Sequence, residues 1–434
     1  MEALFEFAIF LAALLLFLAT GTPVAVATGL LGIAGVYLFL PHAVLTQLAN
    51  IALAQSSNYV LVVAPLFIMM GEALAATGIG RDLFTAAQIW LRRLPGALAV
   101  GTIFACAAFA AVCGSSPVTA ATIGAMSVPE MINKGYDRRL ALGVTAAGGT
   151  LGILIPPSIP LILYGIITET SIGALFIAGI VPGLMMAFLL MLTVWYKVWR
   201  NPAVAPKASD RVVASERWTS LKSVIPVLIL ATLVLGSIYR GIATPTEAGA
   251  IGAAGALIIA GVLGALGRRV VLRILDNTVR TTAMFVLLIV GGLFSAFVLA
   301  RLGIPQGTAK LLVELHTAPW VIMVLINLLL VVLGMFMDPM SILVIIVPVF
   351  FPAVVALGYD PVWFGVIITI NIEIAAISPP VGFNLFVLKT VIPRVDMRDI
   401  IQGSLIFIVP LAAGIGILIA LPQIALFLPH MMMR

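Results

Sequence analysis

The chain contains 434 residues, of which 62% are hydrophobic and only 9% are charged. Soluble domains carry about 25% charged residues, so this composition excludes a protein that is surrounded only by water. The net charge of +6 resides in short basic clusters between apolar segments, which does not indicate a nucleic-acid-binding surface. Several apolar stretches have the roughly 20 residues that a helix needs to cross a hydrocarbon core about 30 Å thick. The sequence therefore predicts an all-α polytopic membrane protein.

The first segment, residues 1–20, is predicted to be a retained helix rather than a signal peptide. It carries the acidic residues Glu2 and Glu6 and no Lys or Arg, whereas a signal peptide begins with a basic region. The two cysteines, Cys106 and Cys113, lie in apolar sequence without the spacing of a metal site, and we expect them to be small buried residues.

The basic clusters predict the orientation of the chain, because short loops rich in Lys and Arg stay in the cytoplasm. An outside N-terminus places the major clusters on the inner side, at residues 81–93, 134–139, 197–222 and 268–280. This arrangement needs crossings near 2–20, 23–40, 58–77, 140–165, 172–198, 223–239 and 245–267, while the apolar stretch 95–131 enters the membrane and returns. We therefore expect a multi-pass protein of the bacterial inner membrane with both termini in the periplasm.

The sequence contains an internal repeat. Gly135-Tyr136-Asp137 recurs as Gly358-Tyr359-Asp360, and Pro156-Pro157 recurs as Pro379-Pro380, both shifted by 223 residues. Four further matches fall at shifts of 222 to 225: Thr22-Pro23 with Thr244-Pro245, Gly78-Ile79 with Gly303-Ile304, Pro95 with Pro319, and Pro117 with Pro339. Six matches in the same order at a nearly constant shift predict a duplication.

Each copy is predicted to hold about five crossings and one re-entrant hairpin. The first copy, 1–222, has a hairpin at 95–131, a broken helix at 140–165 and a basic cytoplasmic loop at 200–222. The second, 223–434, has a hairpin at 319–357, a broken helix at 361–393 and a last helix at 401–428. Because five is odd, the second copy must be inverted, and Arg138-Arg139 of the first copy is indeed replaced by Pro361-Val362. Inverted repeats with broken helices are typical of secondary transporters.

The two proline pairs are candidate functional breaks. A proline lacks the amide donor and clashes with the preceding helical turn, so each pair unwinds its helix. Freed backbone groups cannot face lipid and must line a cavity in the protein, where carbonyl oxygens suit a hard cation such as sodium. A structural kink is the alternative interpretation.

The hairpin tips are expected to face these breaks. The first tip is Gly114-Ser115-Ser116-Pro117, whose hydroxyls and amides suit an ion. The second tip contains Asp338, and a carboxylate in apolar membrane sequence usually marks a substrate or ion pathway. Three glutamates are weaker candidates, namely Glu72, Glu247 and Glu373, of which Glu247 follows Thr244-Pro245 and suits a helix cap equally well.

Several segments together resemble one family, the large membrane subunit (DctM type) of tripartite ATP-independent periplasmic (TRAP) transporters. The resemblance runs essentially end to end and is carried by Gly71-Glu72, Gly78-Ile79-Gly80-Arg81, Gly149 to Ser158, Thr244 to Gly249, and Ser378 to Leu385. It implies sodium-driven uptake of an organic acid, such as a C4-dicarboxylate or sialic acid, that a soluble periplasmic substrate-binding protein hands over. It also implies an elevator motion and a small four-helix membrane subunit as partner.

The resemblance also implies site residues. One sodium site would use Ser115, Ser116, Gly152, Ile155 and Pro156, and its symmetry mate would use Gly334, Ala375, Ser378 and Val381, largely through main-chain oxygens. The family more often has Thr where Ser378 stands. The substrate would lie between the hairpins, near Ser116, Ser158 and Asp338. No catalytic residue is expected.

Three other functions stay open at this point. A stand-alone sodium or proton symporter for dicarboxylates would share inverted hairpins but need no binding protein. An intramembrane hydrolase would use Ser115 or Ser116, but the three histidines, His42, His316 and His430, are all expected at or near the outer surface. A structural membrane scaffold would show no solute flux. The sequence does not name the organic acid.

Overall fold

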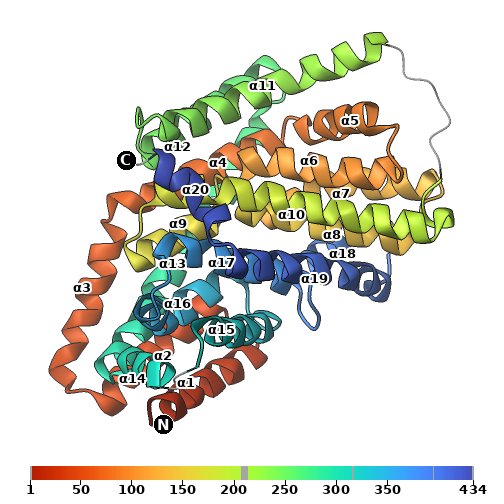
Figure 1. Ribbon diagram of the computed structural model, residues 1–434. Coiled ribbons are helices and arrows are strands. Elements are labelled where there is room, and N and C mark those ends of the chain that lie inside the picture. The colour runs from red at the N-terminus through yellow and green to blue at the C-terminus, as the bar shows by residue number, and fades with distance from the viewer. Residues whose placement is uncertain (1, 207–213, 315–316, 394, 433–434) are drawn as a thin grey trace.

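The computed structural model describes residues 2–206, 214–314, 317–393 and 395–432, and these residues form helices joined by short turns (Figure 1). The α-helices of the first half are α1 (Glu2–Ala19), α2 (Val24–Phe39), α3 (Leu45–Ser56), α4 (Val63–Ala75), α5 (Ile79–Leu91), α6 (Ala97–Cys113), α7 (Ser116–Asn133), α8 (Arg138–Leu154), α9 (Ile159–Thr168) and α10 (Ile172–Arg200). Those of the second half are α11 (Ala214–Tyr239), α12 (Pro245–Val262), α13 (Arg268–Arg301), α14 (Ile304–Glu314), α15 (Pro319–Gly334), α16 (Pro339–Ala356), α17 (Pro361–Ala376), α18 (Phe383–Val391), α19 (Met397–Ala420) and α20 (Gln423–Met432).

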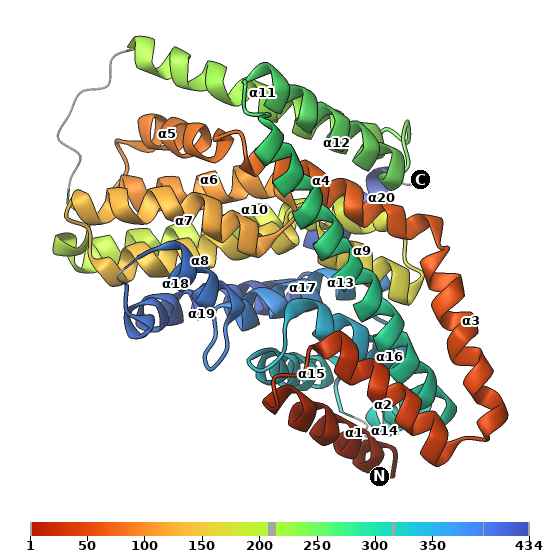
Figure 2. The ribbon, with the colours of Figure 1, turned by 180° about the vertical axis from the view of Figure 1, so that it is seen from behind.

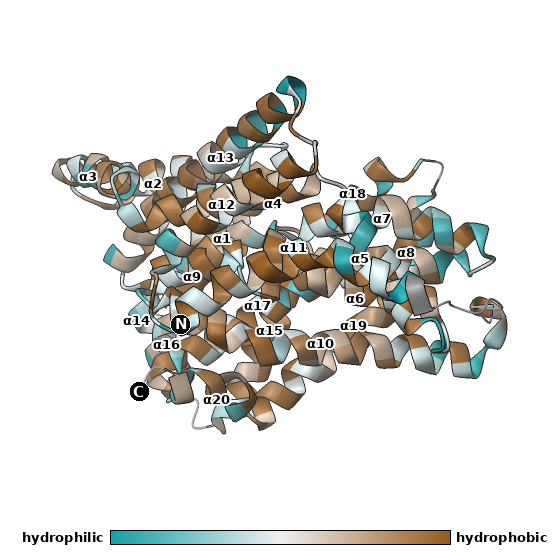
Figure 3. Cartoon of the chain, turned by 90° about the horizontal axis from the view of Figure 1, so that it is seen from above, coloured by the Kyte–Doolittle hydropathy of each residue, from teal (hydrophilic) through white to brown (hydrophobic). Residues whose placement is uncertain are grey.

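The described residues contain seven helices that are long and apolar enough to cross a membrane, or eight if the bent pair α3–α4 counts as one crossing. The 31-residue span Arg138–Thr168 includes the break between α8 and α9. Figure 3 shows hydrophobic residues along the middle of the view and hydrophilic residues concentrated towards its two sides. The predicted all-helical, multi-pass membrane architecture is therefore confirmed.

The helices pack in two groups. In the first, α13 packs on α2, α4 packs on α12, and α11 packs on α5 and α12, so that these helices lie on the outside of the molecule in both ribbon views (Figures 1 and 2). In the second, α8 packs against α6, α7, α10, α17 and α19. Every residue of α8 from Leu140 to Leu154 is buried. The broken helix α8–α9 therefore lies at the centre of the protein.

Glycines allow the closest helix crossings. A Cβ atom placed on Gly143 of α8 would lie 2.0 Å from the carbonyl oxygen of Gly403 on α19. A Cβ atom on Gly291 of α13 would lie 2.3 Å from the carbonyl oxygen of Ala25 on α2. Helices in membranes associate through such close backbone packing, because lipid is as apolar as their side chains. Small residues thus hold each group together.

The helix boundaries differ from the sequence prediction at three places. Residues 45–56 form α3, for which no helix was predicted, and the axis bends by 50° where α3 meets the next helical segment. The side chain of Asn58 accepts a hydrogen bond from the Val60 amide and starts a new turn there, which accounts for the bend. The predicted last helix, 401–428, is divided into α19 and α20 at Leu421-Pro422.

The third difference concerns the boundary between the proposed copies. The predicted position, between residues 222 and 223, falls inside α11, which starts at Ala214. Part of the predicted basic loop, 207–213, lies outside the described residues. Since α11 begins 212 residues after α1, a second copy that begins at α11 repeats the helix order of the first.

Candidate functional site

The first break in the membrane core joins α8 to α9 through Ile155 to Ser158. It contains a cis peptide bond between Pro156 and Pro157. The fully buried Ser158 hydroxyl donates a hydrogen bond to the Ile153 carbonyl and accepts one, at 3.3 Å, from the Leu161 amide. Ser158 therefore caps α9 and satisfies a carbonyl that the prolines release.

The tip between α6 and α7 lies directly against this break. The amide of Ile159 donates to the carbonyl of Gly114 at 3.4 Å. Gly114 has a φ of +66°, and a Cβ atom on it would lie 2.4 Å from the carbonyl oxygen of Pro157. Only glycine fits both the left-handed backbone and the close approach, so the sequence at this position fixes the contact between tip and break.

Two residues of the first predicted sodium site lie side by side. A Cβ atom on Gly152 would be 2.8 Å from the Ser115 carbonyl oxygen and 2.8 Å from the Thr119 hydroxyl. The Thr119 hydroxyl donates to the Ser115 carbonyl at 2.8 Å. Sequence reasoning missed Thr119, although its position one helical turn after the tip is a usable signal.

The other two residues of that predicted site point their side chains elsewhere. A Cβ atom on Gly183 of α10 would lie 2.7 Å from Cγ1 of Ile155, and one on Gly179 would lie 3.4 Å from Cγ of Pro156. The side chains of Ile155 and Pro156 thus pack against α10. These two residues can offer an ion only their main-chain oxygens.

The second tip and the second break repeat the arrangement of the first. The amide of Val381, in the break between α17 and α18, donates to the carbonyl of Met335, in the tip between α15 and α16, at 3.2 Å. A Cβ atom on Gly334 would lie 2.4 Å from Cβ of Ala375. The structure therefore brings together Gly334, Ala375 and Val381, while the hydroxyl of Ser378 donates to the Ile374 carbonyl at 2.7 Å.

Asp338 is the N-cap of α16. Its carboxylate accepts hydrogen bonds from the amides of Met340, at 3.1 Å, and Ser341, at 3.3 Å, and from the Ser341 hydroxyl. A carboxylate at this position satisfies amides of the first helical turn and interacts favourably with the helix dipole. Capping alone accounts for an acidic residue at this tip, so a role in binding needs separate evidence.

Ser116 is connected to a residue that the sequence analysis did not select. Its hydroxyl donates to the side-chain oxygen of Asn384 at 2.8 Å, and the Asn384 amide donates to the Ala146 carbonyl at 3.2 Å. Both polar side chains are buried. Asn384 lies in α18, directly after the second break, so this pair links the first tip to the second broken helix. Within the part of the chain that the structure describes, none of Ser116, Ser158 and Asp338 is hydrogen-bonded to another of the three.

Two of the three glutamates have structural partners. Glu72 of α4 accepts a hydrogen bond from Asn277 of α13 at 2.8 Å. Glu247 forms a capping box with Thr244, in which its side chain accepts from the Thr244 amide at 2.8 Å and its own amide donates to the Thr244 hydroxyl at 3.3 Å. Glu373 has no such partner among the described residues.

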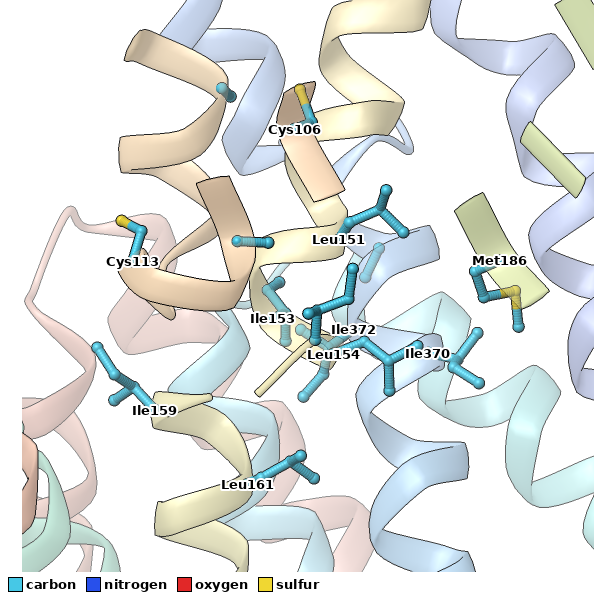
Figure 4. Close-up of a cluster of buried hydrophobic side chains, with 14 of the residues drawn as sticks. Cys106, Cys113, Leu151, Ile153, Leu154, Ile159, Leu161, Met186, Ile370 and Ile372 are labelled. Carbon is cyan, nitrogen blue, oxygen red and sulfur yellow. The ribbon is translucent and has the colours of Figure 1, made fainter. Parts of the chain in front are cut away.

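The breaks lie in a densely packed apolar surrounding. Figure 4 shows Leu151, Ile153 and Leu154 of α8 close to Ile370 and Ile372 of α17, with the two cysteines on the α6 side. Both cysteines are buried free thiols, as predicted. Across the residues that the structure describes, no group of three or more His, Cys, Asp or Glu is placed to hold a metal ion.

Comparison with known proteins decides the family. Residues 11–424 match the family described as "Tripartite ATP-independent periplasmic transporter, DctM component". The chain belongs to this family. The resemblance predicted from the motifs is thereby confirmed, and this permease component is a part of a transporter rather than an enzyme.

The relatives of this DctM component cover nearly its whole length. It is 35% identical to the C4-dicarboxylate TRAP transporter large permease protein DctM of Pseudomonas aeruginosa, over 93% of both chains. It is 34% identical to the DctM protein of Rhodobacter capsulatus, over 100% of both chains, and 34% identical to the sialic acid TRAP transporter large permease protein SiaM of Vibrio cholerae, over 86% of this chain and 87% of that one.

The fold of this DctM component is similar to that of a solved transporter. The crystal structure of the Alcanivorax borkumensis YdaH transporter superimposes with a TM-score of 0.63 over 89% of both chains, at 18% sequence identity. This likeness concerns the fold alone. The name of the family implies two further components, and one relative, the isethionate TRAP transporter permease protein DctMQ of Oleidesulfovibrio alaskensis, is a longer chain of which 58% matches.

The histidines give a hydrolase little support. His430 lies in α20, where it is exposed, and His42 begins a short 3-10 helix between α2 and α3. His316 lies outside the described residues. Neither of the two described histidines belongs to the elements that contain Ser115 and Ser116.

Proposed function

We propose that this DctM component imports an organic acid across the bacterial inner membrane together with sodium. A soluble periplasmic substrate-binding protein would deliver the acid, and a small four-helix membrane subunit would complete the permease. The printed names of its relatives support a carboxylate-bearing solute, since they include permeases for C4-dicarboxylates, sialic acid and 2,3-diketo-L-gulonate. Both termini would lie in the periplasm.

The observation that carries the proposal is the matched contact between tip and break. The bond from Ile159 to Gly114 and the bond from Val381 to Met335 join equivalent atoms, shifted by 222 and 221 residues. Each contact places a helix end, an unwound proline pair and a hairpin tip together inside the protein. This geometry suits ion and substrate sites at the midplane of a transporter built from two inverted repeats.

The main-chain oxygens around these contacts would bind sodium. The first site would use Ser115, Ser116, Gly152, Ile155 and Pro156, and the second would use Gly334, Ala375, Ser378 and Val381. The Ser115 carbonyl and the Thr119 hydroxyl already lie next to Gly152. The second site differs, because the Ser378 hydroxyl is directed to Ile374.

The substrate carboxylate would bind near Ser116 and Ser158, at the starts of α7 and α9. Helix N-termini present amide groups and a positive dipole end to an anion. Asp338 would lie at the edge of this site, where its negative charge favours the hydroxyl groups of a substrate over its carboxylate. The Asn384 side chain holds the Ser116 hydroxyl in place.

An elevator motion would carry this site across the membrane. The moving part would contain the hairpins α6–α7 and α15–α16 and the broken helices α8–α9 and α17–α18. The pairs α2–α13 and α4–α12 would form the fixed scaffold, where Glu72 and Asn277 join α4 to α13.

Uptake of radiolabelled organic acids into proteoliposomes tests the proposal. The liposomes contain this chain with its small membrane subunit, and the binding protein is added outside, with an inward sodium gradient imposed or omitted. We expect uptake only when both sodium and the binding protein are present. Uptake that needs sodium but not the binding protein would instead establish a stand-alone symporter.

A further inference from the structure

Glu373 is the one glutamate of the membrane core whose carboxyl group lacks a partner in the described part of the chain. It lies in α17, its side chain has an exposed fraction of 0%, and neither carboxyl oxygen accepts or donates a hydrogen bond. By contrast, Glu72 and Asp338 both have hydrogen-bond donors. Among the described residues, neither an ion pair nor a helix cap therefore compensates for the burial of the Glu373 carboxyl group.

The helices packed on α17 bring no charged group to the middle of this helix. They are α8, α9, α10, α15, α16, α18, α19 and α20. Their ionisable residues in the described ranges are Arg138, Arg139, Tyr164, Tyr196, Lys197, Arg200, Lys389, Arg398, Asp399 and His430. With the exception of Tyr164, these lie at or near the ends of their helices. Tyr164 donates to the carbonyl of Pro361, which is 12 residues before Glu373 and so about 18 Å away along the helix.

The immediate surroundings of Glu373 are apolar. Its neighbours Ile372 and Ile374 are buried, and Figure 4 shows Ile370 and Ile372 among the aliphatic side chains of α8 and Met186 of α10. An ionised carboxylate without partners is strongly disfavoured in such an environment. A metal ion would need several oxygen ligands, whereas one proton neutralises the group completely.

We propose that Glu373 is a proton-binding site in the membrane core and that the observed packing of α17 requires its protonated form. The site lies two residues before Ala375, which contacts Gly334 at the second tip. Loss of the proton would place a charge on the helix that forms the second proposed sodium site. Protons would thus act on the same moving helix as sodium, which goes beyond the proposed sodium coupling.

The first copy offers no second proton site. The residue equivalent to Glu373, shifted by 223, is Thr150, whose hydroxyl donates to the Ala147 carbonyl at 2.7 Å. The acid is therefore not required by the repeated architecture. This asymmetry predicts one buried protonated glutamate per chain.

Infrared difference spectroscopy of the full permease in lipid nanodiscs tests protonation directly. We expect the carbonyl stretching band of a protonated carboxylic acid at neutral pH, and we expect Glu373→Gln to remove it. Glu72→Gln is the matched control, because Glu72 has a hydrogen-bond donor, and this variant should keep the band. A spectrum in which Glu373→Gln removes no such band would overturn the proposal. This readout does not depend on transport, so it stands even if sodium coupling fails.

Thermal unfolding and uptake between about pH 6 and about pH 10 give a second test. The protonated fraction of a group falls about tenfold per pH unit above its midpoint, so the wild type should lose stability as the pH rises. Glu373→Gln and Glu373→Met cannot ionise and should show flat profiles for the unfolding temperature. The transport arm rests on the proposed function, and there both variants should retain uptake at alkaline pH. Loss of uptake in both folded variants, with an active wild type, would show that the charged form is needed and would contradict the proposal.

Discussion

At the scale of single residues, the hydrogen bonds separate positions that hold the fold from positions that are free to bind. Asp338 belongs to the first kind as an N-cap, and the question is whether its charge also serves transport. Asparagine caps a helix about as well as aspartate, so Asp338→Asn should change the stability by only a few tenths of a kcal/mol. We expect uptake to fall if the charge orients the substrate. Unchanged uptake at saturating and at limiting substrate would remove Asp338 from the site.

The pair formed by Ser116 and Asn384 leads to a second prediction at this scale. Truncation by Asn384→Ala leaves the Ser116 hydroxyl and the Ala146 carbonyl buried without partners, which costs about 1–3 kcal/mol for each group. We expect a lower unfolding temperature and a raised KM for uptake. Thr390→Ala on the same helix is the control, because its hydroxyl is exposed and bonds only to Val387. Equal effects of the two substitutions would argue against a positioning role for Asn384.

At the scale of elements, the tip contact depends on the absence of a side chain at Gly114. Gly114→Ala places a methyl group against the Pro157 carbonyl in addition to forcing a left-handed backbone. Gly78→Ala is the matched control, since Gly78 has a φ of +79° but open space around it. Both variants carry the backbone cost of about 1–2 kcal/mol, but only Gly114→Ala should reduce sodium-dependent uptake, by about tenfold or more. Similar uptake in both variants would show that the tip tolerates displacement.

The crossing of α8 and α19 supports a further prediction about elements. A Cβ atom on Gly403 would lie 2.1 Å from the Arg139 carbonyl oxygen, whereas one on Gly416 of the same helix meets nothing within 4 Å. Gly403→Ala should destabilise the protein by about 1–3 kcal/mol, the typical effect of overpacking. Gly416→Ala should be neutral or slightly stabilising. Thermal unfolding of the two purified variants checks this, and a crossing that is not tightly packed would show no difference between them.

The sequence was most informative about elements where glycine and proline act on their own backbone. The tips at Gly114 and Asp338 and the breaks at the two proline pairs lie where the residues predict them, because proline and glycine determine local conformation. The bend between α3 and α4 was not predicted, since it depends on a side-chain cap at Asn58. The link between Ser116 and Asn384 joins residues 268 positions apart, and only the packed structure brings them together.

At the scale of the whole molecule, the proposal rests on two copies that face opposite sides of the membrane. The helix order supports a duplication, because α6 to α10 and α15 to α19 follow one another with similar breaks. Inversion is a separate statement, since it follows from charge and from an odd number of crossings. It is best tested at equivalent positions of the two copies.

Asn133 and Ala356 are such positions, because both end the second helix of a hairpin, both are exposed, and they are separated by 223 residues. The native thiols Cys106 and Cys113 are buried, so single substitutions to cysteine can be read against a low background. In intact cells, a membrane-impermeant thiol reagent added outside, with the outer membrane permeabilised, should label Ala356→Cys and leave Asn133→Cys unlabelled. Opening the inner membrane should expose Asn133→Cys. Labelling of both residues from one side would mean that the copies are parallel, and the paired tip contacts would then belong to a different transport mechanism.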